Sequence, residues 1–267
     1  MPRAKRWLGQ HFLSDPRILG RIADALAPSA DDTVLEIGPG PGGLTAALTA
    51  RAGQVVAIEK DRDLATALQG RFANLTVVEG DALTLDWHAL VAGAGPTFKI
   101  AGNIPYNITS PLIDKALAPP RPAVVVFLVQ KEVADRVTAA AGTPNYGALT
   151  VGVQAVANAE RLFTLPAGAF VPRPNVDSAL LRLTPLAVPL ISDQERGAFR
   201  RLVVGLFGFR RKQLLRGLRQ LTGAEATKIG AILQAAAIDE HVRPEILTPA
   251  DFVRLYRELV DAAIRVG

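Results

Sequence analysis

The sequence contains no cysteine and only three histidines, so several kinds of chemistry are excluded at the outset. A chain without thiols has no disulfide framework, no cysteine nucleophile and no thiolate metal site. The histidines are far apart, and no two of them share the spacing of metal ligands: His11, His88 and His241. We therefore expect no metal, and the lack of cysteine agrees with a reducing cytoplasm.

Long hydrophobic runs are also missing. The longest, Ala123 to Val129, is too short to cross a bilayer and is typical of a buried strand. The first residues are positively charged but lack the apolar stretch of a signal peptide. Both observations lead us to expect no contact with a membrane. Because hydrophobic residues make up 49% of the 267 residues, we also expect a protein that folds around a core.

Short β-rich runs alternate with helical stretches over the first two-thirds of the chain. The candidate strands are Thr33–Ile37, Gln54–Glu59, Leu75–Glu79, Phe98–Gly102 and Ala123–Gln130. The candidate helices are Pro16–Ala27, Gly43–Arg51, Arg62–Arg71, Ser110–Ala118 and Lys131–Ala140. Asp15 is placed to cap the first helix, with Pro16 at its first position. This alternation predicts a mostly parallel sheet with helices on both faces.

After Tyr146 the pattern changes. A helical stretch, Ala148–Val156, is followed by two strand-like runs that we expect at the sheet edge, Arg161–Thr164 and Ser178–Leu183. Beyond a proline-bounded linker the spacing is helical in Asp193–Phe207, Lys212–Leu221, Ala224–Ala236 and Pro249–Ile264. We therefore expect an α/β domain over residues 1–187 and a small all-helical domain over residues 188–267.

The first strand runs into a glycine-rich segment, Glu36 to Leu44. Glycines allow a tight turn there and let a ligand approach main-chain N–H groups at the start of the next helix. Glu59 ends the second strand, where a carboxylate can accept both hydrogen bonds of a ribose diol and would repel a 2′-phosphate. Because the glycines also fit G-x-G-x-x-G, an NAD-dependent oxidoreductase remains an alternative at this point.

The third strand ends in Asp81 and Ala82. A carboxylate at this position can accept a hydrogen bond from an adenine amino group, although a simple strand-ending turn is an equally good explanation of Asp81 alone. Together with Glu36, the glycines and Glu59, it completes the order seen in class I methyltransferases, which have a Rossmann-like, seven-stranded sheet. This resemblance implies S-adenosylmethionine as the cofactor.

The fourth strand ends in Asn103, Ile104, Pro105 and Tyr106, which resemble the (Asn/Asp)-Pro-Pro-Tyr motif of amino-group methyltransferases. Adenine N6 is a poor nucleophile because its lone pair is delocalised into the ring. The Asn103 side-chain carbonyl and the Ile104 main-chain carbonyl can each accept one N6 hydrogen, and Pro105 restricts Ile104 to extended conformations. Tyr106 offers a flat face on which a flipped base can stack.

Basic residues gather in two places. From residue 196 to residue 219 no acid interrupts a series of cations: Arg196, Arg200, Arg201, Arg210, Arg211, Lys212, Arg216 and Arg219. The N-terminus adds Arg3, Lys5 and Arg6. Such clusters favour a polyanionic partner, the alternative being an ordinary solvated helix face.

Several separated motifs, in one order and over essentially the whole chain, resemble the ribosomal RNA adenine N6-dimethyltransferase family, and within it the bacterial small-subunit enzymes of the kasugamycin-resistance type. The segments that carry the resemblance are 9–13, the glycine motif, Glu59, Asp81, 103–106, 128–134, 170–178 and 209–212. Position 11 is often Asn in these relatives and is His here, and Ile104 replaces the commoner Leu.

The resemblance implies roles for individual residues. Cofactor contacts fall on His11, Leu13, Gly38, Gly40, Glu59, Asp81, Ala82 and Asn103. Phe170 is a second stacking partner for the target base, unless it is an ordinary core aromatic, and Arg210, Arg211 and Lys212 contact the RNA.

The implied substrate is a pair of adjacent adenosines in the 3′-terminal hairpin loop of 16S rRNA in the small ribosomal subunit, each dimethylated by a monomeric enzyme. Looped bases are splayed into a pocket at low cost, which agrees with such a target. Two alternatives stay open: a large-subunit rRNA adenine methyltransferase of the macrolide-resistance type, and a non-enzymatic nucleic-acid-binding factor on the same fold.

Overall fold

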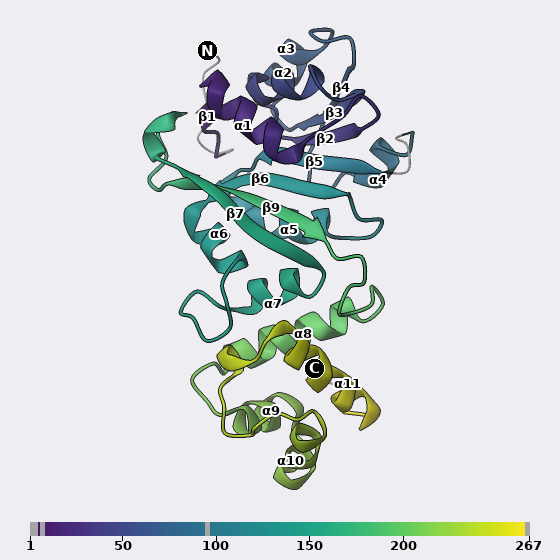
Figure 1. Cartoon of the computed structure of the whole chain (residues 1–267), viewed down its shortest axis with the longest axis vertical. Helices are drawn as coiled ribbons and strands as arrows, with labels where there is room; N and C mark the ends of the chain where they lie inside the picture. The colour runs from purple at the N-terminus through teal and green to yellow at the C-terminus, as the bar shows by residue number, and fades with distance from the viewer. Residues whose placement is uncertain (1–4, 6–8, 94–96, 265–267) are drawn as a thin grey trace. The chain divides into compact units, whose positions relative to one another are not determined.

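The computed structural model describes residues 5, 9–93 and 97–264 (Figure 1). The chain forms two compact units, one of residues 1–134 and 159–185 and the other of residues 135–158 and 186–267. We call them the sheet unit and the helical unit. Among the described residues, no helix is both long and apolar enough to cross a membrane.

The main sheet of the sheet unit has seven strands in the order β4-β3-β2-β5-β6-β9-β7. They are β2 (Thr33–Ile37), β3 (Gln54–Glu59), β4 (Leu75–Glu79), β5 (Phe98–Asn103), β6 (Val124–Gln130), β7 (Ala157–Leu165) and β9 (Ser178–Pro185). Strands β2 to β6 pair in parallel, whereas β9 runs antiparallel to β6. The predicted mostly parallel sheet is therefore confirmed, and the strand order reverses between β2 and β5, where open α/β sheets bind ligands.

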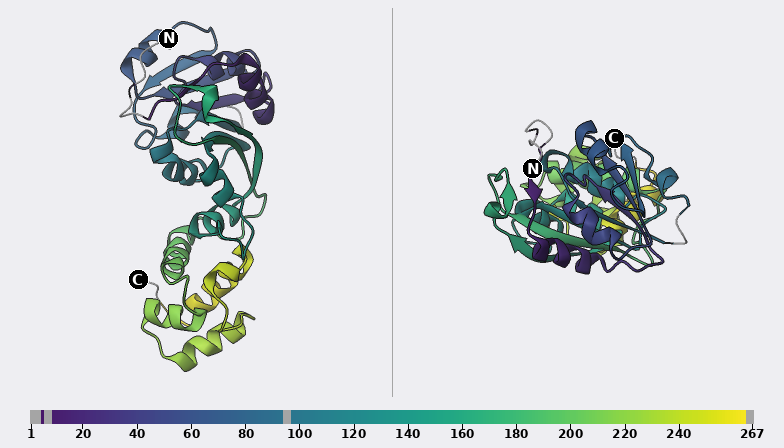
Figure 2. Two further views of the ribbon diagram at one scale, coloured as in Figure 1. Left: turned by 90° about the vertical axis from the view of Figure 1, so that its left-hand side faces the viewer. Right: turned by 90° about the horizontal axis from the view of Figure 1, so that it is seen from above.

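The helices of this unit are α1 (Pro16–Leu26), α2 (Gly43–Thr49), α3 (Arg62–Leu68), α4 (Trp87–Leu90) and α5 (Thr109–Ala116), followed by α6 (Lys131–Val137). They lie on both faces of the sheet, α1 in front of it in Figure 1 and α5 behind (Figure 2). The predicted cap of α1 is confirmed, because Asp15 accepts a hydrogen bond from the Arg17 N–H at 2.9 Å and Pro16 opens the helix.

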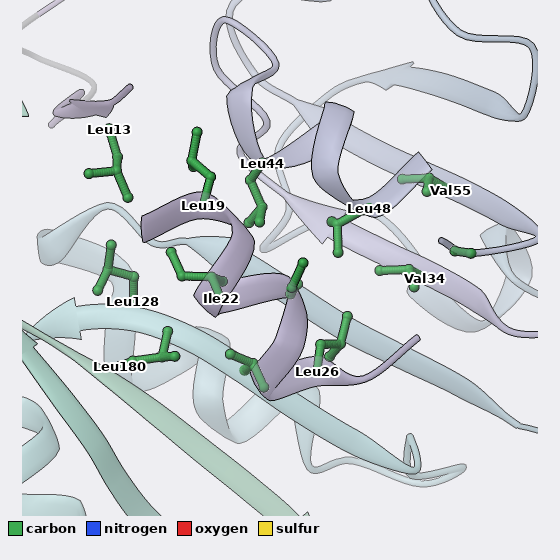
Figure 3. Packing of buried hydrophobic residues seen from close by; sticks show 14 of the residues in the cluster. Leu13, Leu19, Ile22, Leu26, Val34, Leu44, Leu48, Val55, Leu128 and Leu180 are labelled. Carbon is green, nitrogen blue, oxygen red and sulfur yellow. The ribbon is translucent and has the colours of Figure 1, made fainter. Parts of the chain in front are cut away.

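One face of the sheet is covered by α1, whose apolar residues recur at helical spacing. Leu19, Ile22 and Leu26 are buried in a cluster that includes Leu128 of β6 and Leu180 of β9. Figure 3 shows these side chains converging from the helix and the strands. Burying each of them contributes about 1.5–3 kcal/mol to the stability of the folded chain.

A short antiparallel pair, β1 (Phe12–Leu13) with β8 (Phe170–Val171), was not predicted. Two residues are too few to show an alternating pattern. The paired residues are 159 positions apart for Phe12 and Val171, and 157 for Leu13 and Phe170. The pairing places the segment that precedes α1 beside the carboxyl ends of the parallel strands.

The helical unit contains α7 (Ala148–Gln154), α8 (Arg196–Gly208), α9 (Leu214–Thr222), α10 (Ala226–Ala235) and α11 (Pro249–Asp261). A short 3-10 turn of this unit lies at Pro244–Ile246, whereas those at Tyr106–Ile108 and Ala167–Ala169 belong to the sheet unit. Thr248 and Asp251 form a capping box at the start of α11. The Phe207 ring of α8 stacks on the Phe252 ring of α11, with centroids 5.8 Å apart.

The helical unit includes residues 135–158 in addition to the segment that follows Pro185, close to the expected boundary at residue 187. Residues 135–158 belong to the helical unit, since the buried Tyr146 hydroxyl donates to the Leu247 carbonyl at 2.7 Å and the Gly142 N–H donates to the Glu245 carbonyl at 2.7 Å. These partners lie about a hundred positions away, so local sequence patterns carry no sign of them.

The approach of β2 to β5 is close enough to be tested by mutation. Gly102 pairs with Ile37, and a Cβ at position 102 would lie 2.5 Å from the Ile37 carbonyl oxygen. We expect Gly102→Ala to lower the free energy of unfolding by about 1–3 kcal/mol, the usual cost of overpacking. Urea denaturation followed by tryptophan fluorescence measures it.

The matched control is Gly20→Ala in α1, where a new Cβ meets nothing within 4 Å. It should raise stability by about 0.5–1 kcal/mol, because alanine loses less entropy in a helix than glycine does. Equal stabilities of the two variants would contradict the close packing of β2 on β5.

Candidate active site

A cavity of about 250 Å³ opens at the carboxyl ends of β2, β3, β4 and β5, within the sheet unit. Its walls come from the segments that follow these strands and from residues 9–13 before α1. All eight residues predicted to contact a cofactor line it: His11, Leu13, Gly38, Gly40, Glu59, Asp81, Ala82 and Asn103. The four residues of the predicted catalytic motif, Asn103 to Tyr106, line the same cavity.

The glycine-rich turn after β2 uses backbone conformations that favour glycine. Gly38 and Gly40 have φ values of +68° and +56°. The Gly38 N–H donates to the Ile58 carbonyl at 3.0 Å, which ties the turn to β3. A Cβ on Gly40 would lie 3.2 Å from the Phe12 ring, so this position is tight as well as left-handed.

Glu59 holds the glycine turn in place at the end of β3. Its two carboxylate oxygens accept hydrogen bonds from the Gly40 N–H at 3.0 Å and the Asp61 N–H at 2.8 Å. Burial raises the pKa of Glu59, while these backbone donors oppose the shift. Each oxygen has a second lone pair, so the carboxylate can still accept ribose hydroxyls.

Asp81 stands at the end of β4, where Lys60 pairs with it at 2.8 Å. The hydrogen bond from Lys60 and a second one from the Leu83 N–H lower the pKa of Asp81, so its side chain is an ionised acceptor at neutral pH. The following loop is held by Lys115 of α5, whose Nζ donates to the Leu83 and Leu85 carbonyls at 2.9 and 2.6 Å. Sequence reasoning missed both lysines, because nothing in their local pattern marks them.

Asn103 ends β5 and contacts the segment before α1. Its Nδ2 donates to the His11 carbonyl at 2.8 Å, which turns the amide oxygen to the other side. Among the described residues, none donates a hydrogen bond to that oxygen. The Ile104 N–H donates to the Leu128 carbonyl at 3.0 Å, so pairing with β6 fixes the peptide between Asn103 and Ile104, which directly precedes the second predicted acceptor.

Tyr106 is half-buried, and its ring is held from two sides. Its hydroxyl lies 2.7 Å from Ser178 Oγ, and its ring stacks on His11 with centroids 5.5 Å apart. The His11 Nδ1 is in turn 2.8 Å from the Pro172 carbonyl oxygen. Burial raises the pKa of Tyr106, so the phenol stays neutral and presents a flat, uncharged surface.

Glu36 is a further acid of this cavity, 1% exposed at the end of β2. Neither of its carboxylate oxygens has a hydrogen-bond partner within the described part of the chain. The order of motifs in the sequence predicted that Glu36 belongs to the cofactor site. That its carboxyl group is buried without a hydrogen-bond partner can be seen only in the structure.

Other predicted site residues lie elsewhere. Phe170 is 2% exposed, belongs to the core cluster with Leu13, and does not line the cavity. The structure therefore favours the core aromatic over the second stacking surface. No three described His, Asp or Glu side chains are grouped so as to hold a metal ion.

Some residues of the basic clusters form ion pairs with acids, and others line a second cavity. Lys5 pairs with Asp61 at 2.6 Å, whereas Arg3 and Arg6 lie outside the described residues. Arg210 pairs with Glu245 at 3.0 Å. The second cavity, within the helical unit, is lined by five cations and one carboxylate: Arg211, Lys212, Arg216, Arg219, Arg243 and Glu225.

Known proteins resemble this chain over its whole length. A model of the ribosomal RNA adenine dimethylase family matches residues 1–261. A ribosomal RNA small subunit methyltransferase A of Acidithiobacillus ferrooxidans is 40% identical over 268 residues, which cover 99% of this chain and 98% of that protein.

Solved structures agree. A dimethyladenosine transferase from Plasmodium falciparum superposes with a TM-score of 0.84 and 28% identity, covering 96% of this chain and 100% of that one. For the 23S rRNA methyltransferase ErmE the TM-score is 0.70 and the identity 30%, with 93% and 99% covered. The predicted methyltransferase fold is therefore confirmed, and the chain belongs to the ribosomal RNA adenine dimethylase family.

Proposed function

We propose that this chain transfers methyl groups from S-adenosylmethionine to the N6 amino groups of two adjacent adenosines in the 3′-terminal hairpin loop of 16S rRNA, and dimethylates both. One observation carries the proposal: the motif Asn103 to Tyr106 lines the same cavity as the glycine turn, Glu59 and Asp81. The relative from Acidithiobacillus ferrooxidans, named for the small subunit, supports 16S rRNA as the substrate.

The residues of the cavity fit this methyl donor. Glu59 offers acceptors for the ribose hydroxyls, and Asp81 offers an acceptor for the adenine amino group. Leu13 and Ala82 supply buried apolar walls. When bound, the donor supplies a methyl group activated by its bond to a positively charged sulfur.

Asn103 and Ile104 prepare the amino group for attack. The Asn103 amide oxygen and the Ile104 carbonyl each accept one N6 hydrogen, so the nitrogen becomes pyramidal and its lone pair localises. The His11 carbonyl holds the Asn103 amide, so that dipole is oriented before the substrate binds. The bond from the Ile104 N–H to Leu128 and the following Pro105 restrict the backbone of Ile104 and so limit the directions of its carbonyl. No general base is needed first, since the nitrogen becomes acidic only after it is alkylated.

Tyr106 receives the flipped base. His11 covers one face of its ring, so the adenine stacks on the opposite face. The bond to Ser178 fixes the plane of the ring, which orients the amino group relative to Asn103.

The basic cavity of the helical unit gives RNA a second point of contact. Its five cations outnumber its single carboxylate, and Arg211, Arg216 and Arg219 are exposed to solvent. We propose that they bind backbone phosphates of the rRNA in the small subunit. Arg211 and Lys212, two of the RNA contacts that the family resemblance implies, line this cavity. Arg210, the third, forms an ion pair with Glu245.

The alternatives differ in their substrate. The 23S rRNA methyltransferase ErmE has the same fold, so the fold alone does not distinguish the two rRNA substrates. An oxidoreductase would need an acid/base pair such as Tyr-x-x-x-Lys, which this sequence lacks. Labelled methyl transfer to unmethylated small subunits, compared with large subunits, separates the two rRNA substrates. We propose that the enzyme acts as a monomer in the cytoplasm, and light scattering measures its mass in solution.

The first prediction for the proposed function concerns Asn103→Ala. Without the amide acceptor, methyl transfer to small subunits should fall by about 10²–10³-fold or more, because a preorganised dipole at the reacting nitrogen is lost. Affinity for S-adenosylmethionine should largely remain, because Glu59 and Asp81 are unchanged. Filter-binding of labelled methyl groups gives the rate, and calorimetry gives the affinity.

Tyr106→Phe is the matched control for the motif, since it keeps the stacking surface and removes only the bond to Ser178. It should retain much more activity than Asn103→Ala. Full activity of the Asn103 variant would rule out the proposed activation of N6.

The second prediction concerns the basic cavity. Arg216→Ala should weaken binding of the rRNA and reduce the slope of log affinity against log salt by about one, the effect of losing one phosphate contact. Arg17→Ala removes the same charge from a side chain that is 90% exposed in the sheet unit, and should leave the slope almost unchanged. Equal losses in both variants would show that net charge, not this cavity, governs RNA binding.

A further inference from the structure

Glu36 differs from the other acids of the cavity. The Glu59 carboxylate accepts two backbone hydrogen bonds, and Asp81 pairs with Lys60. Both oxygens of Glu36 lack any hydrogen-bond partner among the described residues, although its side chain lines the same cavity. Glu36 is thus a buried carboxyl group with no compensating charge of its own.

The groups around Glu36 do not supply that charge. Glu59 of β3 adds a like charge. The buried Thr45 hydroxyl of α2 is near the Glu36 carboxyl group, but it is not in hydrogen-bonding geometry with it and carries no charge. The remaining titratable groups of the cavity are His11, Lys60, Asp81 and Tyr106, and the cation among them, Lys60, is held by Asp81. A buried carboxylate in this position is costly unless a cation enters from outside.

The cost of that charge is large enough to change the protonation state. Burial raises the pKa of Glu36 to about 8, with the charge of Glu59 acting in the same direction and the Thr45 hydroxyl opposing it. At neutral pH the side chain is therefore mainly a neutral acid while no cation faces it.

We propose that Glu36 is a specificity-determining residue that ionises when the cationic methyl donor enters the cavity, so that donor binding releases a proton. The carboxylic acid loses its proton to solvent, and the resulting carboxylate is compensated by the positive charge of the ligand. This inference rests on the proposed function, since it takes the ligand to be a sulfonium compound.

The proposal has a defined pH dependence. A raised pKa that falls on binding means that the free protein holds more protons than the complex, so affinity rises with pH. Below pH 8, and above the pKa of the complex, affinity should increase about tenfold per pH unit and then level off above pH 8. At pH 7 a pKa near 8 corresponds to about 0.9 proton released per ligand, and at pH 9 to about 0.1.

Isothermal titration calorimetry measures the released proton directly. S-adenosylmethionine is titrated into the protein in two buffers with different ionisation enthalpies, and the difference in binding enthalpy gives the proton count. Glu36→Gln, which mimics the neutral acid in size, should release no proton and lose the pH dependence. At pH 8 its affinity should be at least about tenfold weaker than that of the natural protein.

Two further arms make the test specific. His11→Asn replaces the imidazole group that also lines the cavity, and it should keep the proton release. S-adenosylhomocysteine lacks the sulfonium but keeps the ammonium group: release with the donor alone assigns the sulfonium as the partner of Glu36, and release with both assigns the ammonium.

Binding of the donor without proton release, or with a release that persists in Glu36→Gln, would overturn the inference and leave the proposed function intact. Absence of binding of either compound to the natural protein would instead reject the proposed function, and the inference with it. The measurement on the natural protein tests the proposal even if the variant is unstable.

Discussion

The pairing of β2 with β5 determines where every other part of the site lies. Gly102 sits opposite Ile37, and the absence of a side chain lets the Ile37 carbonyl approach to 2.5 Å from the position of a Cβ. This pair is also where the strand order reverses, so the segments after β2 and β5 diverge and leave a cavity between them. The glycine turn and the motif from Asn103 to Tyr106 therefore face one ligand.

The three acids of this cavity differ in the free energy needed to ionise them. Backbone N–H groups compensate Glu59, and Lys60 compensates Asp81, so both acids stand ready as acceptors. Glu36 lacks such a partner, and the free energy needed to ionise it is recovered only when a cation binds. A site built in this way distinguishes ligands by charge as well as by shape.

Much of the sheet unit was predictable because its strands are apolar and begin and end beside turn residues. The five parallel strands agree with the prediction to within one residue. The residues singled out at or after their carboxyl ends all line the cavity: Glu36, Glu59, Asp81 and Asn103. Two features were not predictable, since each depends on partners far away in the sequence: the β1–β8 pair and the packing of residues 135–158 in the helical unit. For Phe170 the sequence left two interpretations open, and its burial favours the core aromatic. Local patterns carry no information about such contacts.

The amide of Asn103 shows how fold and chemistry constrain the same residue. Its nitrogen donates to the His11 carbonyl and so holds the segment that carries β1 against the cavity, while its oxygen accepts no hydrogen bond from the described residues. An acid at position 103 would keep the acceptor but lose the donor, and it would place a carboxylate oxygen against the His11 carbonyl. Replacement of Asn103 therefore removes the proposed acceptor and the contact to the cavity wall together. One planar amide supplies both, so the position of its oxygen depends on the bond that its nitrogen makes.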